Sequence, residues 1–173
     1  MIYNAFLFGG DHGIYQSVGK IRGAVQYSLI EKKQRIRRRA ESILRNIPES
    51  NPKMEIDALY DWAKNRSHYV KDPRGVEYVK SPELSDDEIS RYGSFLGDCD
   101  DSAAYVAALL KSVGYRVRLV IISDKRLKRP VYNHIFTTVF NPKTKQWSPV
   151  DCTVKNKPTG WKPPTQRISY YEI

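Results

Sequence analysis

The sequence predicts an α+β fold in which N-terminal helices and a cysteine-bearing helix pack on a small antiparallel sheet. Apolar residues recur at helical spacing over residues 28–47 and 53–66. A further apolar helix begins at or next to Cys99. After it come three segments with strand character, residues 115–123, 133–140 and 145–151. The turn residues at 141–144 join the last two segments directly, which predicts antiparallel pairing between them.

The length and composition predict one globular domain. A chain of 173 residues with 40% hydrophobic residues can bury one core, and it is short for two. Residues 1–27 are rich in glycine and show no clear helical period, so we expect an extended N-terminal arm. The domain itself is expected over residues 28–154. A Pro-rich tail over residues 155–173 is expected to wrap the same domain and to add an edge strand at its end.

The charge and the cysteine count limit the class of protein. The net charge of +10 gives a general attraction to acidic surfaces such as nucleic acid, anionic lipid or an acidic protein. Two cysteines do not make a disulfide framework, and the N-terminus does not have the pattern of a signal peptide. No stretch approaches the ~18 apolar residues that a membrane span needs. We therefore expect a cytoplasmic protein with reduced thiols and no membrane contact.

The first predicted helix has a strongly basic face. Six of the eight residues at 32–39 are lysine or arginine. Such a face can dock a partner or grip phosphates, but a solvated helix face is the favoured interpretation. Further along, residues 67–70 and 76–79 flank a turn and predict a short hairpin or a paired loop.

The segment from Gly97 to Asp101 places Cys99 at a helix N-terminus. Gly97 allows a sharp turn, Asp98 is a good N-cap, and Asp101 resembles the second half of a capping box. A helix N-terminus favours a thiolate and can hold an oxyanion. The neighbouring aspartates oppose this effect, because nearby negative charge raises the pKa of a thiol. A nearby cation is therefore required, and a histidine is the obvious candidate.

Strand periodicity predicts which histidine this is. If residues 141–144 form a four-residue loop, residues 140 and 145 pair, and His134 then lies opposite Asp151. Cys152 points to the other face. We expect the face that bears His134 and Asp151 to pack over the Cys99 helix. Asp151 would then orient the imidazole of His134, which would deprotonate Cys99.

The order of these residues resembles the papain-related transglutaminase-like superfamily, in particular its small bacterial and bacteriophage members with a Gly-Asp-Cys-Asp-Asp box. The resemblance covers roughly residues 54–154. Its motifs include Tyr69-Val70-Lys71-Asp72-Pro73, Glu77-Tyr78-Val79-Lys80-Ser81-Pro82, Asn133-His134 and Trp147-Ser148-Pro149-Val150-Asp151. The resemblance implies a papain-like core with Cys99 as nucleophile, His134 as base and Asp151 as third member. Asp100 departs from the animal crosslinking enzymes, which usually have an aromatic residue directly after the cysteine.

The leading hypothesis is a thiol enzyme that acts on amide or peptide bonds through an acyl-enzyme on Cys99. It would be a peptidase, an amidase or deamidase, or an acyl transferase, with a protein or peptide substrate and without a cofactor or metal. The alternative is a structural bacteriophage virion protein that docks neighbouring subunits through the N-terminal arm and basic residues 32–39. It would lie in the host cytoplasm or in the virion.

Two further hypotheses are weaker on sequence grounds. A nucleic-acid-binding module would explain the positive charge, but base-stacking motifs are absent from the sequence. A structural metal site could use Cys99, His134, Cys152 and an aspartate. These residues lack the paired close spacing of zinc modules, and the predicted register separates Cys152 from His134.

Overall fold

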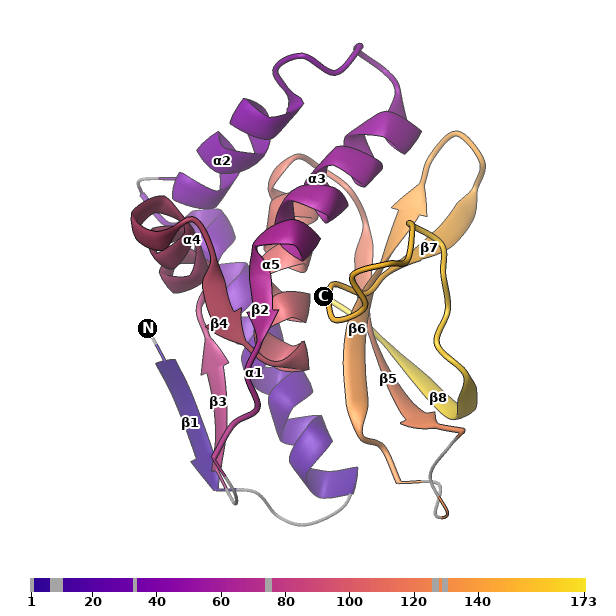
Figure 1. The fold of residues 1–173 in the computed structure, drawn as a ribbon. Helices are drawn as coiled ribbons and strands as arrows, with labels where there is room; N and C mark the ends of the chain where they lie inside the picture. Colours follow the sequence, from indigo (N-terminus) through magenta and orange to yellow (C-terminus); the bar gives the residue numbers. More distant parts are fainter. Residues whose placement is uncertain (1, 7–10, 33, 74–75, 126–127, 129–130) are drawn as a thin grey trace.

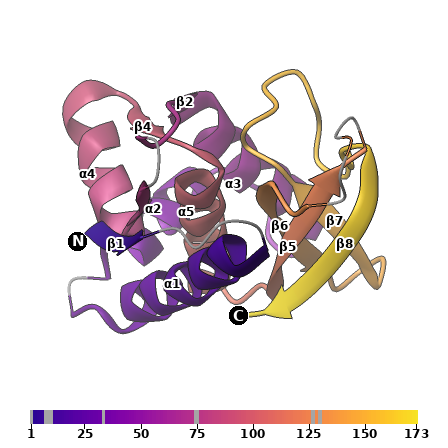
Figure 2. The ribbon, with the colours of Figure 1, turned by 90° about the horizontal axis from the view of Figure 1, so that it is seen from below.

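The computed structural model describes residues 2–6, 11–32, 34–73, 76–125, 128 and 131–173. In this part of the chain the helices lie on one side of the molecule and a four-stranded sheet lies on the other (Figure 1 and Figure 2). The predicted α+β architecture is confirmed. The helices are α1 (Asp11–Ile30), α2 (Arg35–Leu44), α3 (Pro52–Arg66), α4 (Pro82–Tyr92) and α5 (Cys99–Ser112). Within the described residues, none of them combines the length and the apolar character needed to cross a membrane.

The four-stranded sheet has the order β7-β6-β5-β8, and all neighbouring strands are antiparallel. Its strands are β5 (Val117–Asp124), β6 (His134–Asn141), β7 (Gln146–Val150) and β8 (Thr165–Glu172). The C-terminal tail supplies β8, which pairs with β5. The predicted edge strand at the end of the chain is therefore confirmed.

Helix α5 lies between the sheet and the other helices (Figure 1). Every residue from 100 to 110 is buried, including the aspartates of the first turn. On the sheet side, the hydroxyl of Thr137 donates to the carbonyl of Ala103 over 3.0 Å. On the helix side, the ring of Tyr105 meets Phe95 at 5.4 Å between centroids. Because α5 is enclosed on both sides, its first residue is held in a fixed place relative to the sheet.

The predicted hairpin over residues 67–70 and 76–79 is wrong. Strand β2 (Ser67–Tyr69) instead pairs in parallel with β4 (Phe95–Gly97), the strand that leads into α5. Strand β3 (Val76–Lys80) pairs with β1 (Ile2–Phe6). A turn-like sequence between two short strands does not force them to pair. The positions of α3 and α4 determine which strands lie side by side, because β2 follows α3 while β3 and β4 flank α4.

The predicted extended arm over residues 1–27 is also wrong for most of the described residues, since only β1 is extended and α1 follows it. The larger apolar residues that α1 buries, at spacings of three and then four, are Val18, Ile21 and Val25. The glycines within α1 make this helical spacing of apolar residues difficult to recognise in the sequence. Gly19 and Gly23 have open space around them, and each costs a helix only about 1 kcal/mol relative to alanine. Burying three branched side chains outweighs that cost.

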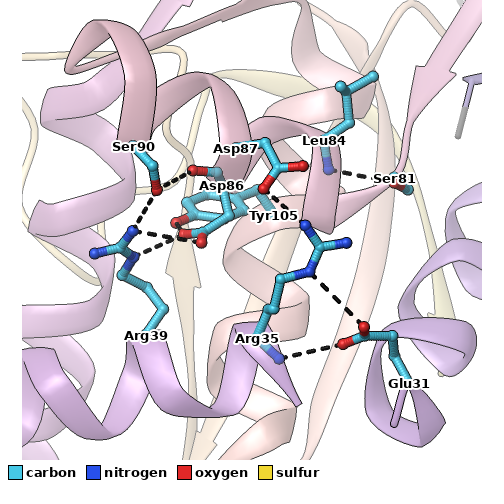
Figure 3. Close-up of polar contacts among 9 residues, drawn as sticks. All are labelled: Glu31, Arg35, Arg39, Ser81, Leu84, Asp86, Asp87, Ser90 and Tyr105. Atoms are coloured by element: carbon cyan, nitrogen blue, oxygen red, sulfur yellow. Dashed lines mark hydrogen bonds and ion pairs between the residues drawn. The ribbon is translucent and has the colours of Figure 1, made fainter. Parts of the chain in front are cut away.

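The helix predicted over residues 28–47 is broken at Gln34, whose φ of 47° is left-handed, and α2 begins one residue later. Two arginines of α2 point towards α4 (Figure 3). The contacts are Arg35 Nη1 to Asp87 Oδ1 and Arg39 Nε to Asp86 Oδ1, each 2.7 Å. Part of the basic face at 32–39 therefore holds the protein's own helices together. Lys33 lies outside the described residues, and docking of a partner on this face stays a prediction.

Candidate active site

Cys99 is the first residue of α5, and the predicted capping box is present. Asp98 accepts the Asp100 N–H over 3.0 Å, while Asp101 accepts the Asp98 N–H over 3.3 Å. The Cys99 side chain is half-buried, and its sulfur lies 3.6 Å from Oδ1 of Asp100. The helix N-terminus favours a thiolate at this position, whereas the buried carboxylate of Asp100 opposes it.

Asp101 joins three segments around this thiol. Besides the Asp98 N–H, its carboxylate accepts the backbone N–H of Lys80 in β3 over 2.7 Å. A Cβ on Gly97 would lie 2.3 Å from Asp101 Oδ2, so this position has room only for glycine. The sequence suggested a sharp turn at Gly97. The structure shows that its role is to let the Asp101 carboxylate approach the backbone.

Burial raises the pKa of the Asp101 carboxyl from 3.8 to about 6. The hydrogen bonds from Lys80 and Asp98 act in the opposite direction, because they favour the ionised form. Desolvation outweighs them, since the side chain is 2% exposed. The group that orders the start of α5 therefore titrates in mildly acidic solution.

The structure brings His134 and Asp151 together. Nε2 of the imidazole lies 2.7 Å from Oδ2 of Asp151. Asp151 is buried, which by itself would raise the pKa of its carboxyl. The hydrogen bond and the charge of His134, together with bonds from Thr153, reverse this and lower the pKa below the usual 3.8. Asp151 is thus kept ionised next to the imidazole.

Two residues that the sequence analysis missed hold Asp151 in place. Thr153 donates both its N–H (3.0 Å) and its hydroxyl (2.7 Å) to Oδ1 of Asp151. The phenol of Tyr60 in α3 donates to the backbone carbonyl of Asp151 over 3.0 Å. The sequence contains a signal for the first contact, because aspartate followed two residues later by threonine is typical of a local side-chain turn. No local signal points to Tyr60.

The predicted β6–β7 register was wrong by one residue on each strand. Phe140 pairs with Trp147 and Asn141 pairs with Gln146, so the four-residue loop is 142–145. Asn141 is responsible, because its side-chain oxygen accepts the N–H groups of the next loop residues. His134 is consequently not directly opposite Asp151. Because the register moves by one residue on both strands, the side chains of His134 and Asp151 still lie on the same face of the sheet.

The face of β6 that packs on α5 is also not the predicted one. Thr137 contacts Ala103 of α5, so the face towards α5 is the one with Ile135 and Val139. The ring of His134 stacks instead on Phe136, with 5.9 Å between the centroids. Strand β6 and helix α5 run in the same direction, so His134 and Cys99 both begin their elements at the same end of the molecule (Figure 1). Pairing of the Cys99 thiol with His134 stays a prediction.

Cys152 differs from Cys99 in its burial, since Cys99 is half-buried and Cys152 is buried. It is 3% exposed, and burial followed by the charge of Asp151 raises the pKa of its thiol. A metal site with Cys152 is therefore disfavoured, since a metal ligand must be a thiolate. The ligand atoms of Asp98, Cys99 and Asp100 do lie within 4.8 Å of one another. That cluster caps a helix N-terminus, whose partial positive charge disfavours a cation.

A family model described as the transglutaminase-like superfamily matches residues 38–152, which include Cys99, His134 and Asp151. The chain belongs to the transglutaminase-like superfamily. No curated protein sequence matches it. Membership gives the fold in which these three residues lie.

Solved structures with the same fold include two named as proteases. A "putative cysteine protease" from Cytophaga hutchinsonii has a TM-score of 0.52 at 15% identity, covering 90% of this chain and 56% of its own. A "putative protease" from Parabacteroides distasonis ATCC 8503 has a TM-score of 0.53 at 9% identity, covering 82% and 26%. A chain of Rad4–Rad23 bound to a 6-4 photoproduct UV lesion reaches only 0.45 at 16% identity, covering 94% and 45%. This member of the superfamily thus spans about half, or less, of the length of these proteins.

Proposed function

We propose that the protein is a thiol enzyme that acts on amide or peptide bonds through an acyl-enzyme on Cys99. The observation that carries the proposal is the 2.7 Å contact between His134 and a buried, ionised Asp151 in a chain of this superfamily. A buried carboxylate that orients an imidazole is the supporting part of a nucleophile–base–orienter set. Cys99 at the N-terminus of α5 supplies the thiol.

The contact supports separate roles for the two nitrogens of His134. Nε2 faces Asp151, so it carries the proton that the carboxylate accepts. Nδ1 is then the nitrogen that takes the proton from the Cys99 thiol. Asp151 stabilises the imidazolium that forms, and Thr153 keeps Asp151 from turning away.

In acylation, the Cys99 thiolate attacks the carbonyl carbon, and a C–S bond forms as the carbonyl electrons move to oxygen. The backbone N–H of Cys99 at the start of α5 stabilises this oxyanion. The imidazolium of His134 gives its proton to the leaving amine, and the C–N bond breaks to leave a thioester. Water or a second amine, deprotonated by His134, then attacks the thioester and releases Cys99. The choice between water and amine distinguishes a hydrolase from a transferase.

The test measures how fast iodoacetamide alkylates each cysteine between pH 5 and pH 9. We expect Cys99 to react at least about tenfold faster than a free cysteine at pH 6, because an imidazolium neighbour favours the thiolate. Cys152 is the internal control and should stay unlabelled in the folded protein. His134→Ala and Asp151→Asn should each slow labelling of Cys99 by about tenfold or more, whereas the exposed His68→Ala should not change it.

Labelling of Cys99 at the rate of a free cysteine, unchanged by His134→Ala, would contradict the proposal. That outcome would favour the structural alternative, in which the fold is retained without chemistry. None of the solved structures described above is named as a virion protein, so this alternative rests on the sequence alone.

A further inference from the structure

The segment after β7 is fastened to the last turn of α3. Residues 151–157 carry Asp151 and run back towards the end of that helix (Figure 1). The phenol oxygen of Tyr60 in α3 lies 3.0 Å from the carbonyl oxygen of Asp151 and 3.1 Å from that of Lys157. The ammonium of Lys64, also in α3, donates to the same Lys157 carbonyl over 3.1 Å. Side chains of the helix therefore hold the backbone of the segment.

Lys155 makes the reverse contact, from the segment to the helix. Its ammonium donates to the carbonyls of Lys64 and Ser67, and it lies 3.2 Å from the hydroxyl oxygen of Ser67. An ammonium has three N–H donors, so this contact uses all of them. The last carbonyls of a helix have no partners within it and carry partial negative charge. Lys155 is thus the cation that satisfies the end of α3.

This cation is kept at an electrostatic cost. Within the described residues, the hydrogen bonds of its ammonium all end on neutral oxygen atoms. Burial lowers the pKa of Lys155 below 10.5, and the charge of Lys64 lowers it further, although Cys152 acts in the opposite direction. An apolar side chain could cover the same surface without a charge to desolvate. What only the ammonium provides is a defined distance between the segment and α3.

The end of α3 leads directly to the candidate nucleophile. Ser67 is the first residue of β2, which pairs in parallel with β4. The N–H of Val70, directly after β2, donates to the Gly97 carbonyl over 2.9 Å. Cys99 follows two residues later. The hydroxyl oxygen of Ser67 also lies 3.4 Å from the carbonyl oxygen of Cys152 in the fastened segment. Ser67 therefore links this segment to the strand pair that precedes the thiol.

We propose that Lys155 is a positioning residue that holds the segment with Asp151 against α3 and so fixes the His134–Asp151 pair relative to Cys99. It acts on Asp151 through the shared segment, and on Cys99 through Ser67, β2 and β4. Loss of the ammonium lets the segment leave α3, and the imidazole then moves with Asp151 away from the thiol. The inference rests on the proposed function, in which His134 deprotonates Cys99.

The test measures how strongly alkylation of Cys99 by iodoacetamide at pH 6 depends on His134. The quantity is the ratio of the alkylation rates before and after His134→Ala, determined in the parent and in Lys155→Met. We expect a ratio of about ten or more in the parent and of about one to two in Lys155→Met, because a displaced imidazole no longer assists the thiol. A substitution that only lowers overall stability leaves this ratio unchanged, since the folded molecules keep their pair.

A second readout does not depend on Cys99 chemistry. The amide of Thr153 donates to Asp151, so its hydrogen exchange reports whether the segment is ordered. In Lys155→Met it should exchange about tenfold faster relative to the amide of Leu109 in the buried part of α5, the effect of losing hydrogen bonds from one charged group.

Two further variants check specificity and folding. Lys157→Met is the matched control in the same segment, because its ammonium lies over the Trp161 ring, 5.5 Å from the centre, and its backbone carbonyl is kept. It should change neither readout. Ser67→Ala removes one acceptor of Lys155 and leaves the charge in place. It should move both readouts in the same direction as Lys155→Met by about threefold, and it serves if Lys155→Met does not fold.

A ratio in Lys155→Met equal to that of the parent would overturn the proposal, whatever the exchange of Thr153. Equal effects of Lys155→Met and Lys157→Met would also overturn it, because the total charge of the segment would then be responsible. A ratio of about one already in the parent refutes the proposed enzyme instead. The exchange of Thr153 then decides the role of Lys155 alone, since faster exchange supports it and unchanged exchange refutes it.

Discussion

Asp101 and Asp151 are both buried carboxylates that accept backbone N–H groups, yet their pKa values move in opposite directions. Asp151 faces the imidazole of His134, and the attraction between them outweighs burial. Asp101 accepts only the backbone N–H of Lys80, and the charged end of that lysine acts on it from farther away. Burial therefore has the larger effect on the pKa of Asp101. The charge state of a buried acid is therefore decided by whether a cationic side chain meets it directly.

Asp101 should make the protein less stable as the pH rises from about 4 to about 6. The folded state binds its proton more tightly than the unfolded state, because the pKa is about 6 when folded and 3.8 otherwise. The difference is worth about 3 kcal/mol. Urea unfolding at pH 4, 5, 6 and 7 should show this decline in the parent relative to Asp101→Asn. A difference between the two proteins that is constant over this range would contradict the assignment.

Asp151 should have the opposite effect. Its pKa is lowered on folding, so its contribution to stability is complete above the ordinary carboxyl pKa and is lost as the pH falls through the lowered value. Asp151→Asn should therefore be destabilising at pH 7 by about 1 to 3 kcal/mol, and this deficit should shrink below pH 4. The measurement is the free energy of unfolding of both proteins by urea at pH 7 and pH 3. An equal deficit at both pH values would show that the carboxylate charge is not responsible.

At the level of elements, the start of α5 depends on how closely β4 approaches it. Gly97 ends β4, and the carboxylate of Asp101 occupies the space where a side chain would be. The capping box, the contact with β3 and the position of Cys99 are all set at this junction. A change that separates β4 from α5 should thus affect the thiol as well as stability.

Gly97→Ala should destabilise the protein by about 2 to 3 kcal/mol, because the new methyl group collides with Asp101. It should also slow alkylation of Cys99. Gly19→Ala is the matched control. Gly19 lies in α1 with open space around it, so alanine there should add about 0.5 to 1 kcal/mol through helix propensity. Equal effects of the two substitutions on the melting temperature would contradict the role of Gly97.

At the level of the whole molecule, one polar network ties the outer helices to the central one (Figure 3). Asp86 of α4 accepts hydrogen bonds from Arg39 of α2 (2.7 Å) and from the phenol of Tyr105 in α5 (2.8 Å). Trp62 of α3 donates to the same phenol over 3.3 Å. Four helices therefore meet at one buried phenol and one carboxylate. The network fixes α4, which carries the chain into β4 and Cys99.

Arg39→Met should cost about 2 to 3 kcal/mol, because it leaves the carboxylate of Asp86 buried without its cation. Arg37→Met is the matched control on the same helix. Arg37 pairs with Glu41 on the exposed surface, and such pairs contribute less than about 1 kcal/mol. Chemical unfolding of both variants at neutral pH measures the difference. Similar losses in the two variants would show that α2 is not fastened through Asp86.

The sequence by itself determined the features with strong local signals. Asp98, Asp101 and the apolar run after Cys99 define α5 and its first residue, because capping and helical periodicity act within a few positions. The alternation along β6 and β7 placed His134 and Asp151 on one face. That result was kept although the loop lies one residue later than predicted, because both strands shifted together.

The tertiary structure decided what depends on distant partners. It determined that residues after Asp11 form α1, that β2 and β3 pair with β4 and β1, and that the face of β6 with Thr137 is the one that covers α5. It also determined that Arg35 and Arg39 of the basic helix contact α4. Glycine content, turn composition and charge describe a segment without its surroundings. Burial and pairing depend on which other segments reach it, and only the folded chain brings those segments together.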